Sequence, residues 1–544
     1  QHNDVEIIKC FFYRSKFRQV LEENAQHIIL TDLNQQISTA SGPTKALLNL
    51  IYYSSLRDYY NENRYLIQRR TNLVSDSDDF LTWTTTDFET KTQIAIEATL
   101  ADEAVLKNTP LTAYEAIFDF FTIDKFKTEN LYNYLLKENI QFYTSKISVW
   151  DFNQATFETS KSSLLGTTEN FTKLNLDDIT NAQLKTTLTY YQKLENAEPT
   201  LENILNRLQF CNDYLVTSDE DLLVSLNKIK EKLSKPSEKH LVNLQIAFIY
   251  AKNASKQTHP DYNIKAIKLL DSIIATQDHS NTYKKAIQKK EEIASKSLTV
   301  QLQKQLYNKE NSRAFISYQN TNNIIISYYK IPNTTFNAFE NNYRTRDSLV
   351  DDIKKNTKLS TITKYELIDK KDYFEYTTEV MLPQLTTGNY LVYFESEDEL
   401  KETKGYGYEV ITITELSLLA SSNDQAQNYT VLNRKTGKPL ENVTIKSNHF
   451  TITTNVNGLA TYTETADKNR DYENSTLVVS TIADTLSINN NYLSYQYDYD
   501  GDDKVKFKGK VEFFLDRAIY RPGQTVYYKG IAFQKKRQPV GSCS

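Results

Sequence analysis

Hydrophobic residues recur at helical spacing through the first half of the chain. In the segment 220–233, four apolar residues are separated by four, three and four positions, so they share one face of an α-helix. They are Leu222, Leu226, Ile229 and Leu233. Pro236 follows and ends this helix, because proline cannot continue one. Further helical patterns at 240–255 and 263–276 predict short helices packed as successive hairpins, as in a solenoid.

The pattern changes at about residue 299, where short runs of β-branched and aromatic residues alternate with turn residues. Runs at 314–319, 323–331 and 389–396 are of this kind and predict strands. Glycine follows the same division, since two glycines precede residue 388 and ten lie between 388 and 541. Hairpin turns need glycine and helix interiors avoid it. The second half is therefore predicted to be rich in antiparallel β-structure.

These patterns predict a multidomain chain with an all-α, helical-hairpin (solenoid-like) N-terminal region at 1–298. Two β-sandwiches of about 100 residues each follow, at 299–418 and 419–508. The last part, 509–544, has room for about two or three strands, too few to close a sandwich. We therefore expect either that the chain is a piece of a longer protein or that a partner chain completes this domain by strand addition.

Composition narrows the function classes. Of the 544 residues, 39% are hydrophobic and 24% are charged, as in ordinary globular proteins, and the net charge is −5. This charge gives no reason to expect nucleic acid as a partner. No apolar run in the sequence reaches the length of a transmembrane segment. The three cysteines, Cys10, Cys211 and Cys543, lie far apart, so they form no metal-binding or redox pair of the C-x-x-C type.

The sequence offers no catalytic, cofactor-binding or metal-binding constellation, so we expect no enzyme and no cofactor. The six histidines share no zinc motif, and neither a G-x-S-x-G elbow nor a phosphate loop is present. Acidic residues at 497–504 alternate like the start of a calcium loop. Such a loop needs glycine and glutamate where Asp503 and Gly509 stand, so an acidic turn is favoured over a calcium site.

The most distinctive stretch, D-R-A-I-Y-R-P-G-Q-T-V, lies near the end of the chain. A strand is predicted before Asp516 and another from Gln524. Between them, Pro522 fixes its own φ and Gly523 supplies the positive φ of a type II turn. On physical grounds this is a structural β-corner rather than a catalytic site. The residues that form it are Asp516, Arg517, Tyr520, Arg521, Pro522, Gly523, Gln524 and Val526.

This corner resembles the D-R-x-x-Y-R-P-G-Q-x-V motif that opens an early macroglobulin-like domain in the alpha-2-macroglobulin family. The segment 434–462, with its Gly-Lys-Pro-Leu turn and Asn457-Gly458, resembles the preceding domain of bacterial members. The segments 381–396 and 410–421 resemble closing strands of the domain before that. In the helical part, 42–72 and the segment around Trp83 resemble the N-terminal region of the Bacteroidetes branch.

The resemblance implies macroglobulin-like β-sandwiches and a protease inhibitor that traps its target after a bait segment is cut. Many family members also hold a thioester in a Cys-x-Glu-Gln sequence, and none of the three cysteines here is followed by that pattern. Bait and thioester segments are expected downstream, with target proteases bound through those domains. The alternative is a non-inhibitory envelope scaffold that docks an outer-membrane protein complex. Either way we expect an exported protein of the bacterial envelope, in the periplasm or at the outer membrane.

Overall fold

The computed structural model describes most of the chain in two compact units, Gln1–Ile249 and Tyr250–Ser544. Residues outside the description are 1–3, 23–24, 72–78, 119–126, 148–160, 216–217, 398–404, 423–425, 464–474, 492–507, 516–524 and 536–544. No helix among the described residues has the length and apolar character that crossing a membrane requires.

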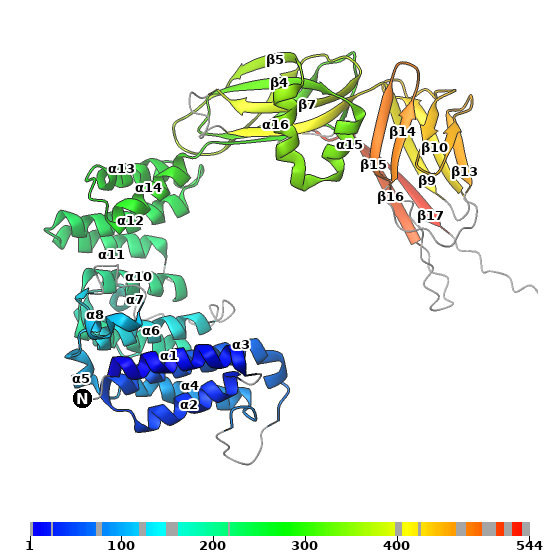
Figure 1. Ribbon diagram of the computed structural model, residues 1–544. Coiled ribbons are helices and arrows are strands. Elements are labelled where there is room, and N and C mark those ends of the chain that lie inside the picture. The colour runs from blue at the N-terminus through cyan, green and yellow to red at the C-terminus, as the bar shows by residue number, and fades with distance from the viewer. Residues whose placement is uncertain are drawn as a thin grey trace, which may run out of the picture. The chain divides into compact units, whose positions relative to one another are not determined.

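Helices build the first unit and continue into the second (Figure 1). Several begin at side-chain caps: the Thr84, Asn181 and Thr200 side chains each accept a hydrogen bond from the backbone N–H three residues on. The helices are α1 (Asp4–Leu21), α2 (Ala25–Thr39), α3 (Gly42–Ile67), α4 (Thr85–Ala98), α5 (Glu103–Lys107), η1 (Leu111–Ile117), α6 (Leu131–Lys146), α7 (Lys161–Leu164), α8 (Thr168–Thr172), α9 (Ala182–Ala197), α10 (Leu201–Tyr214), α11 (Asp219–Lys232), α12 (Pro236–Asn253), α13 (Tyr262–Ile274) and α14 (Asn281–Ala294).

Aromatic rings form one core of the first unit, between α3 and α4. Phe80, Trp83 and Phe88 are buried there, and Tyr59 packs against them from α3. The rings of Trp83 and Phe88 meet edge to face, with centroids 5.3 Å apart. The capping box at Thr84, in which Asp87 returns the hydrogen bond, starts α4 directly beside this cluster. Local capping and ring packing therefore fix the start of α4 beside α3.

The first β-domain encloses its core between two sheets. One has the strand order β1-β3-β6 and the other β2-β8-β7-β4-β5, where only the β2–β8 pair is parallel. Buried side chains from both sheets form one hydrophobic cluster. The strands are β1 (Ser297–Gln301), β2 (Gln305–Leu306), β3 (Ser312–Gln319), β4 (Asn323–Ile331), β5 (Leu359–Glu366), β6 (Tyr376–Leu382), β7 (Gly388–Ser396) and β8 (Tyr406–Ile413).

Two helices that the sequence pattern did not reveal interrupt this domain between β4 and β5. They are α15 (Asn333–Asn341) and α16 (Arg346–Asn356), joined by the short helix η4 (Tyr343–Thr345). Figure 1 shows them beside the larger sheet. Phe339 and Ile353 from the helices pack with Tyr393 and Val410 from the sheet in a second cluster. The larger sheet is thus buried on both faces, and β7 is accordingly buried along nearly its whole length, with an apolar run from Tyr390 to Phe394.

The second β-domain repeats the two-sheet arrangement with shorter strands. Its sheets have the orders β13-β10-β9 and β12-β11-β14-β15, and both contribute to one buried cluster. Gly458, at φ +71°, closes the turn before β13, where a Cβ would lie 2.5 Å from the Val431 carbonyl oxygen. The strands are β9 (Leu416–Ser422), β10 (Ala426–Asn433), β11 (Thr444–Lys446), β12 (Thr451–Thr453), β13 (Leu459–Thr463), β14 (Ser475–Ser480) and β15 (Thr485–Asn491).

Two transitions along the chain depend on long-range contacts. The helical series ends at Ala294, near the predicted 298, but the second compact unit already starts at Tyr250. Within this unit, the Asn263 side chain of α13 donates hydrogen bonds to the Asp372 and Tyr373 carbonyl oxygens, at 3.3 and 3.4 Å. A long-range polar contact of this kind leaves no mark on local periodicity.

The second transition lies within the segment 410–421, which resembles the closing strands of a single domain in sequence. It is divided between two. Val410 belongs to β8 of the first β-domain, whereas β9 starts at Leu416 and pairs with β10 of the second. The side chain of Leu416 is buried in the second core. The chain therefore passes from one β-domain to the next at Thr414–Glu415.

Candidate functional site

The predicted corner lies between two strands that the structure contains. β16 (Lys508–Leu515) and β17 (Tyr528–Lys535) pair antiparallel, with Leu515 opposite Tyr528. Of the motif residues, Val526 is described, and its side chain is exposed. The other seven, Asp516, Arg517, Tyr520, Arg521, Pro522, Gly523 and Gln524, lie outside the described residues. The acidic stretch 497–504 does so as well.

The β16–β17 hairpin exposes apolar side chains on both faces. Phe513 and Phe514 are neighbours in a strand, so they point to opposite sides, and both are exposed. Phe513 contacts the Tyr528 ring edge to face at 5.6 Å, which fixes the pairing of the two strands. A two-stranded ribbon is marginally stable alone in water. The structural role of the corner motif therefore stays a prediction.

The passage between the two β-domains is held by a polar constellation that sequence analysis missed. Asp484 Oδ2 accepts hydrogen bonds from the Thr414 hydroxyl, at 2.8 Å, and from the Glu415 backbone N–H, at 2.7 Å. Thr414 is fully buried and donates its own N–H to the Leu306 carbonyl oxygen of the first β-domain. Thr414 is therefore bonded to both β-domains at once.

Arg434 holds the same segment from its other side. Its Nε and Nη2 atoms donate to the Leu416 carbonyl oxygen at 3.1 and 2.8 Å, and Nη2 also donates to the Gln305 side chain. Burial lowers the pKa of the Arg434 guanidinium, and the charge of Asp484 opposes this shift. We call Asp484 and Arg434 the linker clasp. No periodic pattern marks either residue, because both act on backbone groups far away in sequence.

A second polar constellation lies inside the helical unit. Arg207 of α10 and Glu195 of α9 are fully buried and form an ion pair, with Nε 2.8 Å from Oε1. Arg207 also donates to the Leu164 carbonyl oxygen and, at 2.9 Å, to that of Gly166, while Glu195 accepts from the Thr168 hydroxyl at 2.8 Å. The pair thus joins two helices to the connection between α7 and α8. Its groups are mutually satisfied, as in a structural network rather than a reactive site.

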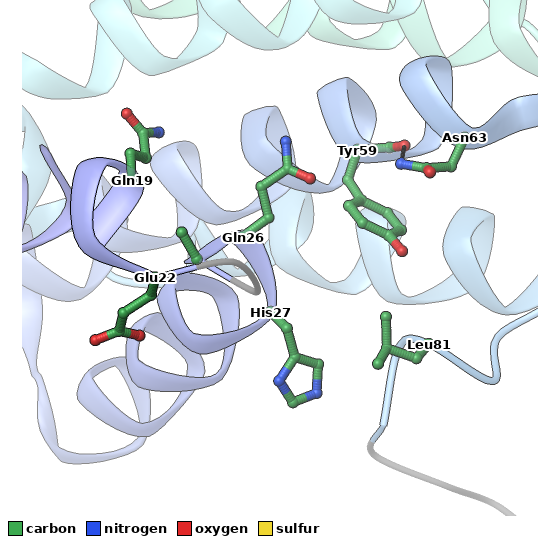
Figure 2. Close-up of a pocket in the computed structure, with 8 residues that line it drawn as sticks. Gln19, Glu22, Gln26, His27, Tyr59, Asn63 and Leu81 are labelled. Carbon is green, nitrogen blue, oxygen red and sulfur yellow. Dashed lines mark hydrogen bonds between the residues drawn. The ribbon is translucent and has the colours of Figure 1, made fainter.

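The surface of the helical unit carries a polar depression of about 430 Å³, shown in Figure 2. Its lining includes Gln26, which donates to Glu62 Oε2 at 2.8 Å, and His27, which lies 3.4 Å from the Asp79 carboxylate. The His27 ring also stacks on Phe80, with centroids 5.1 Å apart. The depression is lined by Gln19, Glu22, Ala25, Gln26, His27, Tyr59, Asn63 and Leu81. Amides and a carboxylate of this kind can bind a small polar molecule, but they include no nucleophile with an adjacent base.

The described residues were also searched for metal-ion sites and reactive thiols. No group of three or more histidine, cysteine, aspartate or glutamate side chains could hold a metal ion there. Cys211 is buried, and burial raises the pKa of its thiol to about 12, so it carries no reactive thiolate at neutral pH. Cys10 is exposed on α1.

Comparisons with known proteins return structural neighbours only. No family model matches the chain, and no curated protein matches it. A crystal structure of native alpha-2-macroglobulin from Escherichia coli spanning domains MG0-NIE-MG1 has a TM-score of 0.28 and 13% identity over 36% of this chain and 64% of that chain. This chain thus spans less than two thirds of that fragment.

Two further structures of the same Escherichia coli protein are similar over part of the chain. A crystal structure spanning domains NIE-MG1 has a TM-score of 0.28 and 13% identity over 36% of this chain and 97% of that chain. A cryo-EM reconstruction of the native conformation has a TM-score of 0.27 and 15% identity over 44% of this chain and 15% of that chain.

Proposed function

We propose that this chain is the N-terminal, structural portion of a bacterial envelope protein of the alpha-2-macroglobulin type, and that the intact protein inhibits proteases by trapping them. The observation that carries the proposal is the D-R-A-I-Y-R-P-G-Q-T-V stretch, whose residues match the family's corner motif at eight positions from Asp516 to Val526. Its place after a helical region and two β-domains agrees with the order that the resemblance implies.

Within such a protein, this portion acts as a scaffold. The polar constellations that the described residues form are used to hold connections: Arg207 and Glu195 between helices, and the linker clasp between β-domains. The sequence contains no Cys-x-Glu-Gln stretch, so covalent capture of a protease would depend on other segments. Protease contact would likewise be made outside these domains.

A non-inhibitory envelope scaffold is the second candidate. The absence of a thioester sequence from these 544 residues fits it equally well. In that case the helical region docks an outer-membrane protein complex, and the β-domains act as spacers. Both candidate functions are those of an exported protein, and they differ in what happens when a protease cuts that protein.

A trapping assay on the product of the intact gene separates them. The protein is incubated with an excess of trypsin-like, chymotrypsin-like or elastase-like protease, and the residual activity is measured on a small peptide and on casein. A trap leaves cleavage of the small peptide intact while cleavage of casein falls, because the caged protease excludes large substrates. Equal activity on both substrates, with the inhibitor degraded, contradicts the proposal and favours the scaffold. The 544-residue chain alone is the control and is expected to inhibit neither reaction.

A further inference from the structure

Helix α15 has neighbours in both β-domains, which belong to the same compact unit. Phe336 and Phe339, 7% and 2% exposed, pack its apolar face on the larger sheet of the first β-domain. The helix also lies against β15 of the second β-domain. There the Asn489 side-chain amide donates a hydrogen bond to the Asn337 side-chain oxygen at 3.4 Å. The helix α15 therefore connects the two β-domains at a place other than the linker.

Burial on the outer face of β15 agrees with this contact. Leu486 and Ile488 point into the core of the second β-domain, so by strand alternation Ser487 and Asn489 point away from that core. The outer face of an antiparallel sandwich is ordinarily solvated, but Ser487 is only 5% exposed. The side-chain oxygen of Asn489 accepts a hydrogen bond from the Thr476 hydroxyl at 2.8 Å, which leaves its amide N–H groups free to face α15.

The start of α15 is fixed to its own sheet by polar contacts. Asn333, the first residue of the helix, accepts a hydrogen bond from the side-chain amide of Asn389 on β7. Asn389 is 3% exposed and accepts in turn from the Thr412 hydroxyl of β8 at 2.7 Å. Buried groups that satisfy one another in this way hold each side chain in one orientation. A shift of α15 against its sheet would break these buried hydrogen bonds.

The contacts between the β-domains are spread along one end of the larger sheet, where β2, β8 and β4 all end. Arg434 bonds to Gln305 of β2, and Lys435 forms an ion pair with Glu310, which follows β2. The linker leaves from β8, and α15 follows β4. Two strands separate β2 from β4, so the contacts span about 14 Å at a strand spacing of about 4.8 Å. Contacts on both sides of a linker oppose rotation about it.

Domains that are joined by a linker alone move relative to one another by default. We propose that the two β-domains instead form one rigid body, in which α15 and the ion pair between Lys435 and Glu310 prevent rotation about the linker at Thr414–Glu415. A rigid junction is compatible with either function proposed above. If the intact protein is a protease trap, the rearrangement after cleavage takes place outside these two domains.

Double electron–electron resonance on the full 544-residue chain tests the proposal. Nitroxide labels are attached to Thr377→Cys on β6 and Thr453→Cys on β12, both at exposed positions. The background carries Cys10→Ser and Cys543→Ser, and Cys211 is buried, so it is not labelled. We expect one narrow distribution of distances between the labels, with a width set by the labels themselves.

The contact between α15 and β15 is tested by Ser487→Lys. We expect this variant to widen the distance distribution at least about twofold, because a buried position cannot hold an unpaired ammonium group and the contact opens. Thr461→Lys is the matched control, since Thr461 is an exposed residue on the outer face of β13, and it should leave the distribution unchanged. Circular dichroism melting verifies that the variants fold. If Ser487→Lys does not fold, Asn337→Lys places the same charge on the α15 side of the contact.

The ion pair is tested by Lys435→Ala. Both partners of this pair are about half exposed, so the single variant should widen the distribution only slightly. Combined with Ser487→Lys, it should widen the distribution beyond that of Ser487→Lys alone. Lys438→Ala is the control, because Lys438 is an exposed lysine three residues further along the chain.

Three outcomes would overturn the proposal. The first is a broad or bimodal distribution in the parent chain. The second is a folded Ser487→Lys or Asn337→Lys variant with the same narrow distribution as the parent, because the contact with α15 would then not fix the junction. The third is equal widening by Thr461→Lys, which would show that any lysine on the second β-domain has this effect.

Discussion

The helical unit and the β-domains each hold a connection with one arginine and one carboxylate, but they use these groups differently. In the helical unit, Arg207 and Glu195 bind each other, and both are fully buried. At the passage between the β-domains, Arg434 and Asp484 bind backbone groups of residues 414–416. Arg207 also donates to the backbone carbonyl oxygens of Leu164 and Gly166 at the end of α7, but its charge is balanced by the Glu195 carboxylate. A chain that passes between sheets has free backbone groups, and these can satisfy a charge directly.

This comparison predicts which substitutions destabilise each region most. Removing one partner from the helical pair leaves an unpaired charge in a dry interior, which is among the most costly changes a protein can suffer. Removing one member of the linker clasp leaves neutral groups without hydrogen bonds, which costs less. The four predictions below follow this order.

The largest effect is expected for Arg207→Met. It leaves the Glu195 carboxylate buried without its partner and should lower the free energy of unfolding of the helical unit by about 3–5 kcal/mol. Tryptophan fluorescence during urea unfolding measures this directly, because Trp83 is buried in the aromatic core of the helical unit.

Two further variants sharpen the result. Arg207→Met combined with Glu195→Leu should recover much of the loss, since the unpaired charge is gone. Lys173→Met removes a well-exposed partner of Glu169 and should have almost no effect on the unfolding midpoint. If Lys173→Met were as destabilising as Arg207→Met, the explanation through burial would be wrong.

The next largest effect concerns Gly458. A Cβ at this position would lie 2.5 Å from the Val431 oxygen and 2.9 Å from Pro439 Cβ, in a residue with φ at +71°. Gly458→Ala is expected to destabilise the second β-domain by about 2–4 kcal/mol through backbone strain and overpacking together. Hydrogen exchange of peptides from β10 and β13 measures it.

Gly437 provides the control because it shares the positive φ, +66°, but has nothing within 4 Å of a built Cβ. Gly437→Ala should therefore cost only about 1 kcal/mol, from the backbone conformation alone. Equal effects of the two alanine variants would show that the close approach at Gly458 is unimportant.

Asp484→Ala is expected to cost about 1–3 kcal/mol, because the Thr414 hydroxyl and the Glu415 N–H both lose their acceptor. Hydrogen exchange should rise in peptides spanning residues 411–418 before it rises elsewhere in the β-domains. Asp484→Asn keeps one acceptor oxygen and should fall between the alanine variant and the parent. Unchanged exchange at 411–418 in the alanine variant would contradict the role assigned to the linker clasp.

The smallest effect is a pH dependence at Glu415. A hydrogen bond from Lys309 lowers the pKa of the Glu415 carboxyl, aided by a bond from Asn308. Because the pKa is depressed in the folded protein, the stabilisation is present above the ordinary carboxyl pKa and is lost as the pH falls through the folded value. The melting temperature of Glu415→Gln should therefore fall slightly less than that of the parent on acidification below about pH 4.5. If the melting temperatures of the variant and the parent change identically with pH, the hydrogen bond between Lys309 and Glu415 does not contribute to stability.

Some helices could be predicted from the spacing of neighbouring apolar residues, and others could not. The buried faces of α11 and α13 follow from apolar spacing, and Leu222, Leu226, Ile267 and Leu270 are all buried. The start of α11 is set by Ser218, whose hydroxyl accepts a hydrogen bond from the Asp221 N–H, although another hydroxyl residue, Thr217, precedes it in the sequence. Two adjacent hydroxyl residues have similar capping propensity, and only backbone geometry selects one. The helices α15 and α16 escaped prediction because their apolar residues are few and lie within a strand-rich region.

The sequence by itself determined the change from helices to strands near residue 297, because helix and strand periodicity and glycine use depend on neighbouring residues. It also supplied the corner motif that motivates the proposed function. Only the tertiary structure decided that α13 belongs with the β-domains, that Asp484 and Arg434 hold the passage at Thr414–Leu416, and that α15 contacts β15 of the second β-domain. These features depend on contacts between residues far apart in the chain, and such contacts are selected by the packing of whole elements rather than by any local pattern.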